Sequence, residues 1–496
     1  MQALQRLRLI TGRDHTLGTL MERLAEVHGD RRLVQESDDG LCLTYRQAAK
    51  RVARWAGGIA ERIEPGDNVV VATANGYEQL LLCLAASRAG GVPAPVNDQM
   101  RTEEIARVVE DSGATLVVRA AIEVDGADPL AVSVPADPDA TAALFYTSGT
   151  TGRPKGVELT HRGLVGSLAR AAAWPNWARR DEAVLGLPVA HIMGFAALAG
   201  LACAGIPFYL LTRFNPVRVL DAIEGRRATI FIGVPAMYRM LLEAGASERD
   251  LRSIRVWGSG ADAMPAELAS RFKSLGATAR LPFVGARGEA MFVEGYGMVE
   301  LGGAAAGKIS PPFLDAGLGD SLGWMLPGYR TRVVDDDGEE APTGSVGELW
   351  LQGPGVTSGY HNDADATAEA MSDGWLRTGD LVRKGPFGLV MFAGRQKDVI
   401  KRGGYSVYAV EVERALEEHP SVLEAAVLGL PDERSGEVPV AAVRLVGGAD
   451  LDELALDRWA AERLSTYKVP TRFVAIDELP RTATNKVAKQ ELRPLF

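Results

Sequence analysis

Cysteine is scarce in this sequence: its three residues, Cys42, Cys83 and Cys203, stand far apart and in apolar surroundings. An odd, scattered set of thiols indicates neither a disulfide framework nor a zinc site, and it fits a reducing cytoplasm. The first residues also lack an uninterrupted apolar stretch, because arginines and an aspartate stand among the leucines. We therefore expect no signal peptide and a cytoplasmic protein.

An excess of basic residues is absent as well. Lys and Arg number 54 against 64 Asp and Glu, which gives a formal net charge of -10, and no basic cluster stands out. This balance argues against nucleic acid as a partner. The sequence contains no internal repeat and no low-complexity tract, so a repeat architecture is not expected.

Long uncharged runs are rare, and the one at 193–211 is long enough to cross a bilayer. It consists mainly of Ala and Gly, which insert weakly into lipid, and Pro207 interrupts it. The pattern predicts a buried helix followed by a strand, and no membrane span.

Apolar residues make up 47% of the 496 residues, enough for large cores and for two or more domains. Helix-like and strand-like segments alternate, which predicts parallel sheets covered by helices. Thr102 is the expected cap of the predicted helix at 101–111. The predicted helices are 17–28, 45–63, 77–89, 101–111, 216–224 and 235–244, and the predicted strands are 68–73, 92–96, 115–118, 183–187, 207–211, 229–234 and 253–257.

From about residue 323 the pattern changes to short β-rich pieces at 330–335, 347–353, 379–384 and 389–394, which predict a small β subdomain. The remaining chain alternates helices at 409–418 and 451–464 with strands at 422–430 and 439–445. This tail is expected to form a separate α+β lid.

The stretch 146–156 (YTSGTTGRPKG) gathers hydroxyls, glycines and cations directly behind the apolar run 142–145 and ahead of a helix capped near Thr160. Glycines let backbone N–H groups approach an anion, while Arg153 and Lys155 add positive charge. A Walker loop is excluded, because Lys155 follows a proline and no hydroxyl follows it for magnesium. A plain linker is the other alternative. The composition predicts a grip for a nucleoside triphosphate.

Four further motifs follow in the chain: 296–300 (YGMVE), 374–380 (GWLRTGD), 394–398 (GRQKD) and 479–486 (LPRTATNK). With the loop 146–156, they resemble the signatures of the acyl-adenylate-forming superfamily, of the acyl-CoA synthetase type. The resemblance implies an α/β fold with a large N-terminal domain of two doubly wound α/β subdomains plus a small β subdomain, and a mobile α+β C-terminal lid. The expected boundaries are 1–395 (β subdomain about 323–395), a hinge at 396–397 centred on Lys397, and 398–496.

The resemblance also implies a nucleotide site for ATP and AMP. Tyr296 would stack on adenine, the glycine-rich strand end near Gly260 would line its other face, and Asp380 with Arg395 would hold the ribose. The full set of implied nucleotide-binding residues is Thr147, Ser148, Gly149, Thr150, Thr151, Gly152, Lys155, Gly260, Ala261, Asp262, Tyr296, Gly297, Met298, Val299, Asp380, Arg395 and Lys486.

Glu300 is the predicted Mg²⁺ ligand, because a lone carboxylate together with phosphate oxygens is a usual way to hold this ion. An ordinary solvated glutamate is the alternative. Lys486 resembles the adenylation lysine, a cation that bridges the acid and the α-phosphate when the lid is closed, although a surface charge is the usual role of such a lysine. The implied catalytic residues are Lys486, Thr147, Lys155 and His191.

Coenzyme A would pass the loop of Gly403, Gly404 and Tyr405, where glycine leaves room for a narrow thiol arm. A plain turn explains the two glycines equally. His191 falls where the superfamily places an aromatic gate, or else is a core histidine. The implied acyl pocket is His191, Gly194, Phe195 and Gly295, and Glu294 faces either the pocket or the surface.

Three positions depart from the superfamily pattern: Val299 replaces Thr, Asn485 replaces Gly, and Ala409 replaces Pro. Valine keeps the shape of threonine but loses the hydroxyl that contacts the α-phosphate, so adenylation is the step at risk. Asn485 tolerates the left-handed backbone of a glycine.

The predicted protein is an ATP- and Mg²⁺-dependent ligase of a hydrophobic carboxylic acid and CoA. The alternatives are an enzyme of the thioester half-reaction alone, a stand-alone enzyme that loads a carrier protein, and a non-catalytic nucleotide sensor. The identity of the acid and the oligomeric state, a homodimer included, are left open.

Overall fold

The computed structural model describes residues 2–12, 14–37, 40–148, 154–176, 180–281, 285–313, 321–385, 388–447, 449–482 and 487–496. The chain forms two compact units. Unit 1 comprises residues 1–319, 323–330 and 352–376, and unit 2 comprises 320–322, 331–351 and 377–496. The predicted β subdomain is thus divided: residues 323–330 and 352–376 belong to unit 1, and residues 331–351 and 377–395 belong to unit 2 with the C-terminal residues. The hinge at 396–397 stays a prediction.

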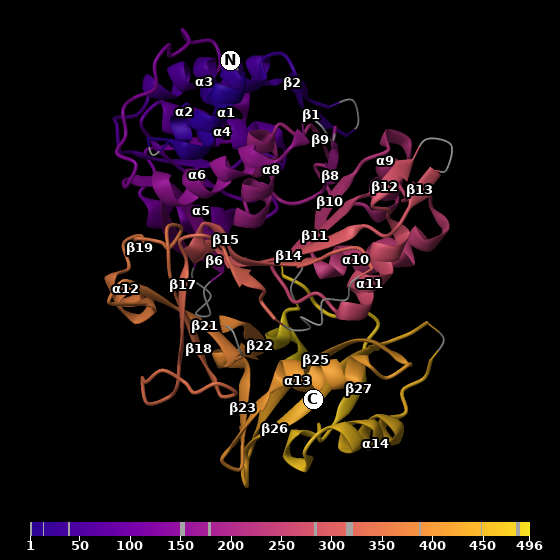
Figure 1. Ribbon diagram of the computed structural model, residues 1–496. Helices are drawn as coiled ribbons and strands as arrows, with labels where there is room; N and C mark the ends of the chain where they lie inside the picture. The colour runs from indigo at the N-terminus through magenta and orange to yellow at the C-terminus, as the bar shows by residue number, and fades with distance from the viewer. Residues whose placement is uncertain are drawn as a thin grey trace. The chain divides into compact units, whose positions relative to one another are not determined.

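Unit 1 is built on a nine-stranded sheet of order β16-β15-β14-β11-β10-β8-β9-β1-β2 (Figure 1). The strands from β14 to β1 run parallel, and β15, β16 and β2 are antiparallel additions at the edges. Their bounds are β1 Arg32–Glu36, β2 Cys42–Thr44, β8 Ala183–Leu185, β9 Phe208–Leu210, β10 Ile230–Gly233, β11 Val256–Gly260, β14 Met291–Met298, β15 Gly303–Ser310 and β16 Trp324–Met325.

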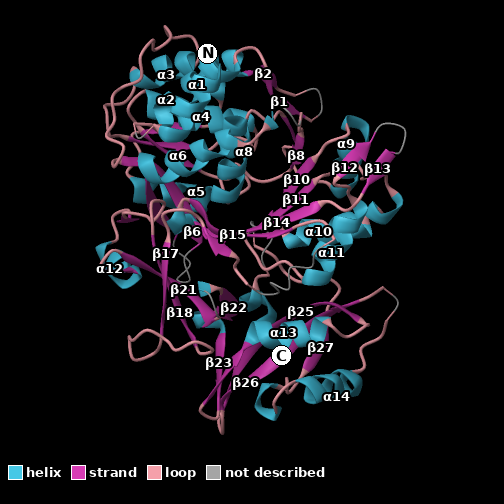
Figure 2. Ribbon diagram, in the orientation of Figure 1, coloured by secondary structure: helices cyan, strands magenta, loops and turns pink. Residues whose placement is uncertain are grey.

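Helices cover both faces of this sheet (Figure 2). The helix α8 (Ile192–Ala204) packs in the same core as Leu185 and Val256. On the other face, α9 (Pro216–Arg226), α10 (Pro235–Glu243) and α11 (Ala266–Leu275) cover a core of edge-on aromatic rings that includes Trp257. The chain passes from β8 to β9 on one side and returns to β10 on the other. This is the predicted doubly wound arrangement, and ligands of such sheets bind where the order reverses.

The rest of unit 1 holds a second parallel sheet, β4-β3-β5, and a small antiparallel sheet, β19-β7-β6. The fourth predicted helix begins at Thr102, so Thr102 is its first residue and not its cap. Instead, the Glu104 carboxylate accepts from the Arg101 N–H at 2.8 Å. The bounds are α1 Gln2–Thr11, α2 Leu17–His28, α3 Tyr45–Ala60, β3 Asn68–Val71, α4 Tyr77–Arg88, β4 Val92–Pro95, α5 Thr102–Ser112, β5 Leu116–Val118, β6 Thr141–Ser148, β7 Pro154–Thr160, α6 His161–Ala169, β19 Gly359–Tyr360, α12 Ala364–Ala370 and β20 Met371–Ser372.

One sheet has the strand order β17-β18-β21-β20, with β22 also paired to β21, and most of its residues belong to unit 2. A second sheet of unit 2 has the order β24-β23-β26-β25, with β27 paired to β26. The helix α13 packs on β25 around Val412, Leu416 and Val427. The bounds are β17 Arg330–Val334, β18 Val346–Gln352, β21 Trp375–Lys384, β22 Val390–Arg395, β23 Val399–Arg402, β24 Tyr405–Tyr408, α13 Ala409–Glu417, β25 Val422–Asp432, β26 Gly436–Leu445, α14 Glu453–Arg463 and β27 Phe473–Ala475.

The uncharged run 193–211 is divided as predicted. The helix α8 ends at Ala204, the residue after it, Gly205, takes the left-handed conformation at φ 71°, and β9 follows after Pro207. Among the described residues, no helix combines the length and the apolar character that a bilayer crossing requires.

Candidate functional site

The predicted triphosphate loop joins two antiparallel strands, β6 and β7, whose register pairs Thr147 with Lys155. The helix after it is capped as predicted, since Thr160 Oγ1 accepts from the Gly163 N–H at 3.0 Å. At the start of the loop, the Tyr146 hydroxyl donates to Asp111 at 2.8 Å. The predicted residues Gly149, Thr150, Thr151, Gly152 and Arg153, and the side chain of Ser148, lie outside the described residues.

Lys155 directs its ammonium toward a tyrosine and an aspartate. Its Nζ lies 5.3 Å from the centroid of the Tyr360 ring and 3.9 Å from Asp363 Oδ2. The Tyr360 hydroxyl in turn donates to Glu300 Oε1 at 3.0 Å. Burial, and then the Glu300 carboxylate, raise the pKa of Tyr360, so the phenol stays a protonated donor. Tyr360 therefore links the predicted cation Lys155 to the predicted metal ligand Glu300.

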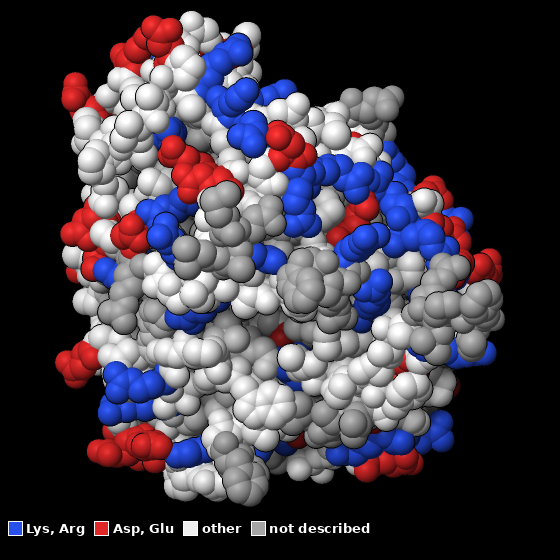
Figure 3. All heavy atoms as spheres, turned by 45° about the horizontal axis from the view of Figure 1, so that its top comes forward, with Lys and Arg blue, Asp and Glu red and all other residues white. Residues whose placement is uncertain are grey.

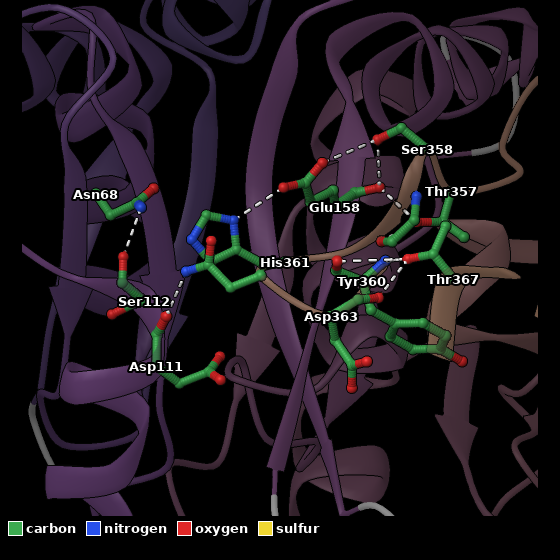
Figure 4. A network of polar contacts seen from close by, with 12 residues as sticks. Asn68, Asp111, Ser112, Glu158, Thr357, Ser358, Tyr360, His361, Asp363 and Thr367 are labelled. Atoms are coloured by element: carbon green, nitrogen blue, oxygen red, sulfur yellow. Dashed lines mark hydrogen bonds and ion pairs between the residues drawn. The ribbon is translucent and has the colours of Figure 1, made fainter. Parts of the chain in front are cut away.

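A network of polar contacts holds the segment that carries Tyr360 (Figure 4). The backbone N–H of Tyr360 donates to Thr367 Oγ1 at 2.9 Å, and His361 Nδ1 lies 2.8 Å from Glu158 Oε1 on β7. Asn362 donates to the Asp111 carbonyl at 3.0 Å. Sequence reasoning missed Tyr360. Its signal is the polar run Tyr-His-Asn-Asp directly after a glycine, which no pattern of apolar residues explains.

The ends of β11 and β14 bring the predicted adenine-binding residues together. Gly260 pairs in register with Gly295, one residue before Tyr296. Ala261 takes a left-handed φ of 68°, a conformation that costs a residue with a Cβ roughly 1–2 kcal/mol and that is typical of functional sites. A Cβ at Gly297 would lie 1.9 Å from the Gly303 carbonyl oxygen, so close strand contact requires glycine there.

Glu294 forms an ion pair within the sheet. Its Oε1 lies 2.9 Å from Nζ of Lys308, its register partner on β15, and the two side chains are 19% and 9% exposed. This pairing argues against the surface alternative, because the carboxylate is held by a neighbouring strand, and the pocket alternative stays a prediction. Val299, next to Glu300, is 8% exposed and packs in the main core of unit 1.

His191 caps the helix α8. Its Nδ1 accepts from the Met193 N–H at 3.3 Å, so a neutral ring carries its hydrogen on Nε2. A Cβ at Gly194 would lie 2.0 Å from the Pro188 carbonyl oxygen. Glycine at this position thus permits close packing of helix and loop, which explains it without a pocket. Phe195 is fully buried and meets Phe145 edge-on at 5.2 Å.

Gly295 differs from Gly194. The nearest atom to a Cβ built there is Ala304 Cβ at 3.8 Å, an ordinary van der Waals distance, so no close backbone contact requires glycine at this position. The assignment of these residues to an acyl pocket stays a prediction, and Gly295 fits it better than Gly194 or Phe195 does.

In unit 2, Asp380 and Arg395 are register partners on β21 and β22, and Arg395 Nε lies 2.9 Å from Asp380 Oδ1. Asp380 is only 2% exposed. Residues 377–380 lie inside β21, where Gly379 takes a left-handed φ of 67°.

Gly403 and Gly404 form the two-residue loop of the β23–β24 hairpin, with φ of 57° and 85°. Both angles favour glycine, so the turn alone explains both residues. Tyr405 stacks on Tyr467 at 4.6 Å between ring centroids. Lys397 is exposed, and Ala409 is the first residue of α13, a position that suits the usual proline equally well.

Lys486 and Asn485 lie outside the described residues. Among the described residues, no group of three or more His, Cys, Asp or Glu side chains is placed to hold a metal ion. On the face drawn in Figure 3, basic and acidic side chains are interspersed.

The chain is similar to known proteins in sequence and in fold. Residues 21–361 match the family model for the AMP-binding enzyme, and residues 411–486 match that for the AMP-binding enzyme C-terminal domain. A feruloyl-CoA synthase of Amycolatopsis sp is 34% identical over 487 residues, covering 92% of this chain and 94% of that protein. The fatty acid–[acyl-carrier-protein] ligase ScoC of Streptomyces coeruleorubidus is 31% identical and covers 92% of each.

A solved structure of o-succinylbenzoate CoA synthetase from Bacillus subtilis, in complex with its acyl-adenylate intermediate, superposes with a TM-score of 0.82. It is 27% identical and covers 96% of this chain and 98% of that one. The same enzyme has been solved with ATP and a magnesium ion, at a TM-score of 0.81, 27% identity and coverage of 96% and 99%.

Proposed function

This chain belongs to the AMP-binding enzyme family, and from that membership we propose that it is an ATP-dependent ligase of a hydrophobic carboxylic acid and coenzyme A. In the first step, a carboxylate oxygen of the acid bonds to the α-phosphorus of ATP and pyrophosphate leaves. In the second, the CoA sulfur loses its proton and bonds to the acyl carbon, and AMP leaves. The likeness to enzymes named as CoA synthases supports both steps.

The observation that carries the proposal is the chain of contacts Lys155–Tyr360–Glu300 beside the β6–β7 hairpin. The first step brings an acid and a triphosphate together, so the site must neutralise negative charge. Lys155 supplies a fixed cation. Glu300 is a single half-buried carboxylate, which suits an ion that takes its remaining ligands from phosphates and water.

The Mg²⁺ ion fits this donor set, with Glu300 as its protein ligand. When bound, it would withdraw negative charge from the triphosphate. The task of the protein here is orientation: Tyr360 donates to Oε1 of Glu300 and so restricts the carboxylate that would hold the ion. In the proposed nucleotide site, Tyr296 and the segment from Gly260 to Asp262 take the base.

Asp380 is the proposed acceptor for the ribose hydroxyls. Its buried carboxylate pairs with Arg395, and an ionised carboxylate accepts two hydrogen bonds at once. Lys486 is the proposed adenylation cation, and Gly403, Gly404 and Tyr405 the proposed passage for CoA. The three cysteines, all among the described residues, are free thiols, which supports a cytoplasmic location.

A carrier protein is the second candidate acceptor. It is favoured by the 31% identity to a protein named fatty acid–[acyl-carrier-protein] ligase. Both acceptors present the same phosphopantetheine thiol, so the first half-reaction does not separate them.

The test is a screen of aryl, cinnamic and aliphatic acids for acid-dependent pyrophosphate release, followed by AMP release with CoA or with a holo carrier protein. We expect release of pyrophosphate with at least one acid and a preference for CoA. The Lys486→Ala variant should lose the first reaction and retain the thioester step from a synthetic acyl-adenylate. If the wild-type protein performs only that thioester step, the chain is an enzyme of the second half-reaction and the proposal is wrong.

A further inference from the structure

The segment that carries Lys486 leaves and re-enters the described part of the chain at a closed stem. Arg481 and Val487 form an isolated β-bridge, and the Ala488 N–H donates to the Pro480 carbonyl at 2.7 Å. Leu479 and Leu492, on either side of the stem, are buried in one small core. The two ends of the segment are therefore adjacent in unit 2.

A buried carboxylate holds one end of this stem. Glu424 on β25 has a side chain only 3% exposed, and its Oε1 accepts from Arg481 at 2.6 Å. Its Oε2 accepts from Arg444 at 3.3 Å, and Arg444 is the register partner of Glu424 on β26. One carboxylate thus serves two guanidinium groups, one in its own sheet and one in the stem.

The contact between Glu424 and Arg481 exceeds what the buried carboxylate needs to be paired. A carboxylate that is removed from water must be paired, and one cation in the adjacent strand already provides a partner. The second, shorter contact to Arg481 adds a charge-assisted hydrogen bond to a segment of another element. It restricts where Arg481, and with it the stem, can lie.

The opposite end is held in a parallel way. Lys489 Nζ lies 2.7 Å from Glu413 Oε1 on α13, and that same carboxylate oxygen accepts from the Val427 N–H at 2.7 Å. Glu424 therefore joins Arg444 on β26 to one end of the stem, and Glu413 joins Val427 on β25 to the other. The segment between Arg481 and Lys489 is therefore held at both ends by an ion pair.

We propose that Glu424 is a positioning residue for adenylate formation: through Arg481 it fixes the base of the segment that carries Lys486. This inference rests on the proposed function of Lys486. A displacement of a reacting group by about 1 Å can cost two orders of magnitude in rate, so a loosened stem should slow the adenylation step. The thioester step does not use Lys486 and should not change.

The two arginines offer a matched pair of variants. Arg481→Gln breaks the contact to the stem and keeps the contact of Glu424 with Arg444, whereas Arg444→Gln breaks the contact within the sheet and keeps the contact with Arg481. The measurements are acid-dependent exchange of pyrophosphate into ATP, thioester formation from synthetic acyl-adenylate and CoA, and the thermal midpoint of each variant. Arg481→Lys, which keeps the cation, tests rescue.

We expect Arg481→Gln to lose about ten-fold or more in exchange and to stay within about two-fold in thioester formation. Arg444→Gln should lower the thermal midpoint and leave both rates within about two-fold, and Arg481→Lys should regain part of the exchange rate. Equal effects of the two glutamine variants, or equal loss of both half-reactions, would overturn the inference.

A wild-type protein without acid-dependent exchange would overturn the proposed function and this inference with it. Exchange in the wild type that requires Lys486 but is unchanged in Arg481→Gln would overturn the inference alone.

Discussion

The hydroxyl of Tyr360 donates a hydrogen bond of 3.0 Å to Oε1 of Glu300, sixty positions away in the sequence. Each residue belongs to a different part of unit 1: Tyr360 to the short strand β19, and Glu300 to the turn of 3-10 helix after β14. The contact orients Oε1 of Glu300, and Tyr360 does not contact Oε2 through this hydrogen bond. It therefore bears directly on how Glu300 meets a metal ion.

Replacing Tyr360 by Phe should weaken the apparent affinity for Mg²⁺. The loss of one hydrogen bond to a charged group, at a half-exposed site, should cost about 1 kcal/mol, or about a five-fold rise in the Mg²⁺ concentration needed for half-maximal pyrophosphate release. A titration of MgCl₂ at fixed ATP measures it. Tyr329→Phe is the control, because its hydroxyl donates to the neighbouring Leu301 carbonyl at 3.3 Å. Similar shifts in both variants would contradict the role of Tyr360.

Asp380→Asn should impair ATP binding more than acid binding. Asn keeps the size of Asp but neither balances Arg395 nor accepts two hydroxyl donors. We expect KM for ATP to rise about ten-fold, which is about 1.4 kcal/mol, with KM for the acid unchanged. Arg377→Gln provides the control: Arg377 lies on the same strand as Asp380, is 42% exposed, and pairs at 3.5 Å with Glu348 on β18. An unchanged KM for ATP in Asp380→Asn would remove Asp380 from the nucleotide site.

Val299→Thr should accelerate adenylate formation. The added hydroxyl would supply a donor to the α-phosphate, which could be worth about one decade in rate. Because Val299 is only 8% exposed, the hydroxyl should also cost about 1 kcal/mol of stability. Pyrophosphate release, compared with AMP release from synthetic adenylate and CoA, checks the rate, and urea unfolding checks the stability. A folded variant with no gain in the first assay would show that another group already makes this contact.

His161 should make the stability of unit 1 sensitive to acid. Burial lowers the pKa of His161 from 6.5 to about 4, and its Nδ1 accepts from the Leu17 N–H at 3.0 Å. Between these two pH values the unfolded chain binds a proton that the folded state excludes, so stability is present above about 6.5 and declines as pH falls toward 4.

Asn in place of His161 retains an acceptor and does not titrate. His161→Asn should therefore flatten the decline in the urea midpoint between pH 7 and 4.5. The buried His28 has the same lowered pKa of about 4 and remains in this variant, so part of the decline should persist. A slope identical to that of the wild type would exclude His161 as a source.

Local patterns predicted most elements well. The helix 17–28 was predicted to the residue, because apolar positions recur at helical spacing between a threonine and a glycine. The first residue of α5 was assigned the wrong role, since Thr102 starts the helix and the acceptor for the Arg101 N–H is the side chain of Glu104. The place of Gly194 in an acyl pocket stays a prediction, and the close approach of the Pro188 carbonyl is a separate reason for glycine there. Helix ends and glycines depend on neighbours that a short window does not contain.

The sequence by itself determined the order of helices and strands, the division of the run 193–211, and the motifs of the AMP-binding enzyme family, because each is written in adjacent residues. Only the tertiary structure decided which charges meet. Tyr360 reaches Glu300, Lys308 pairs with Glu294, and Arg481 reaches Glu424. These contacts depend on strand register and chain crossings, since a shift by one residue turns a strand side chain to the opposite face.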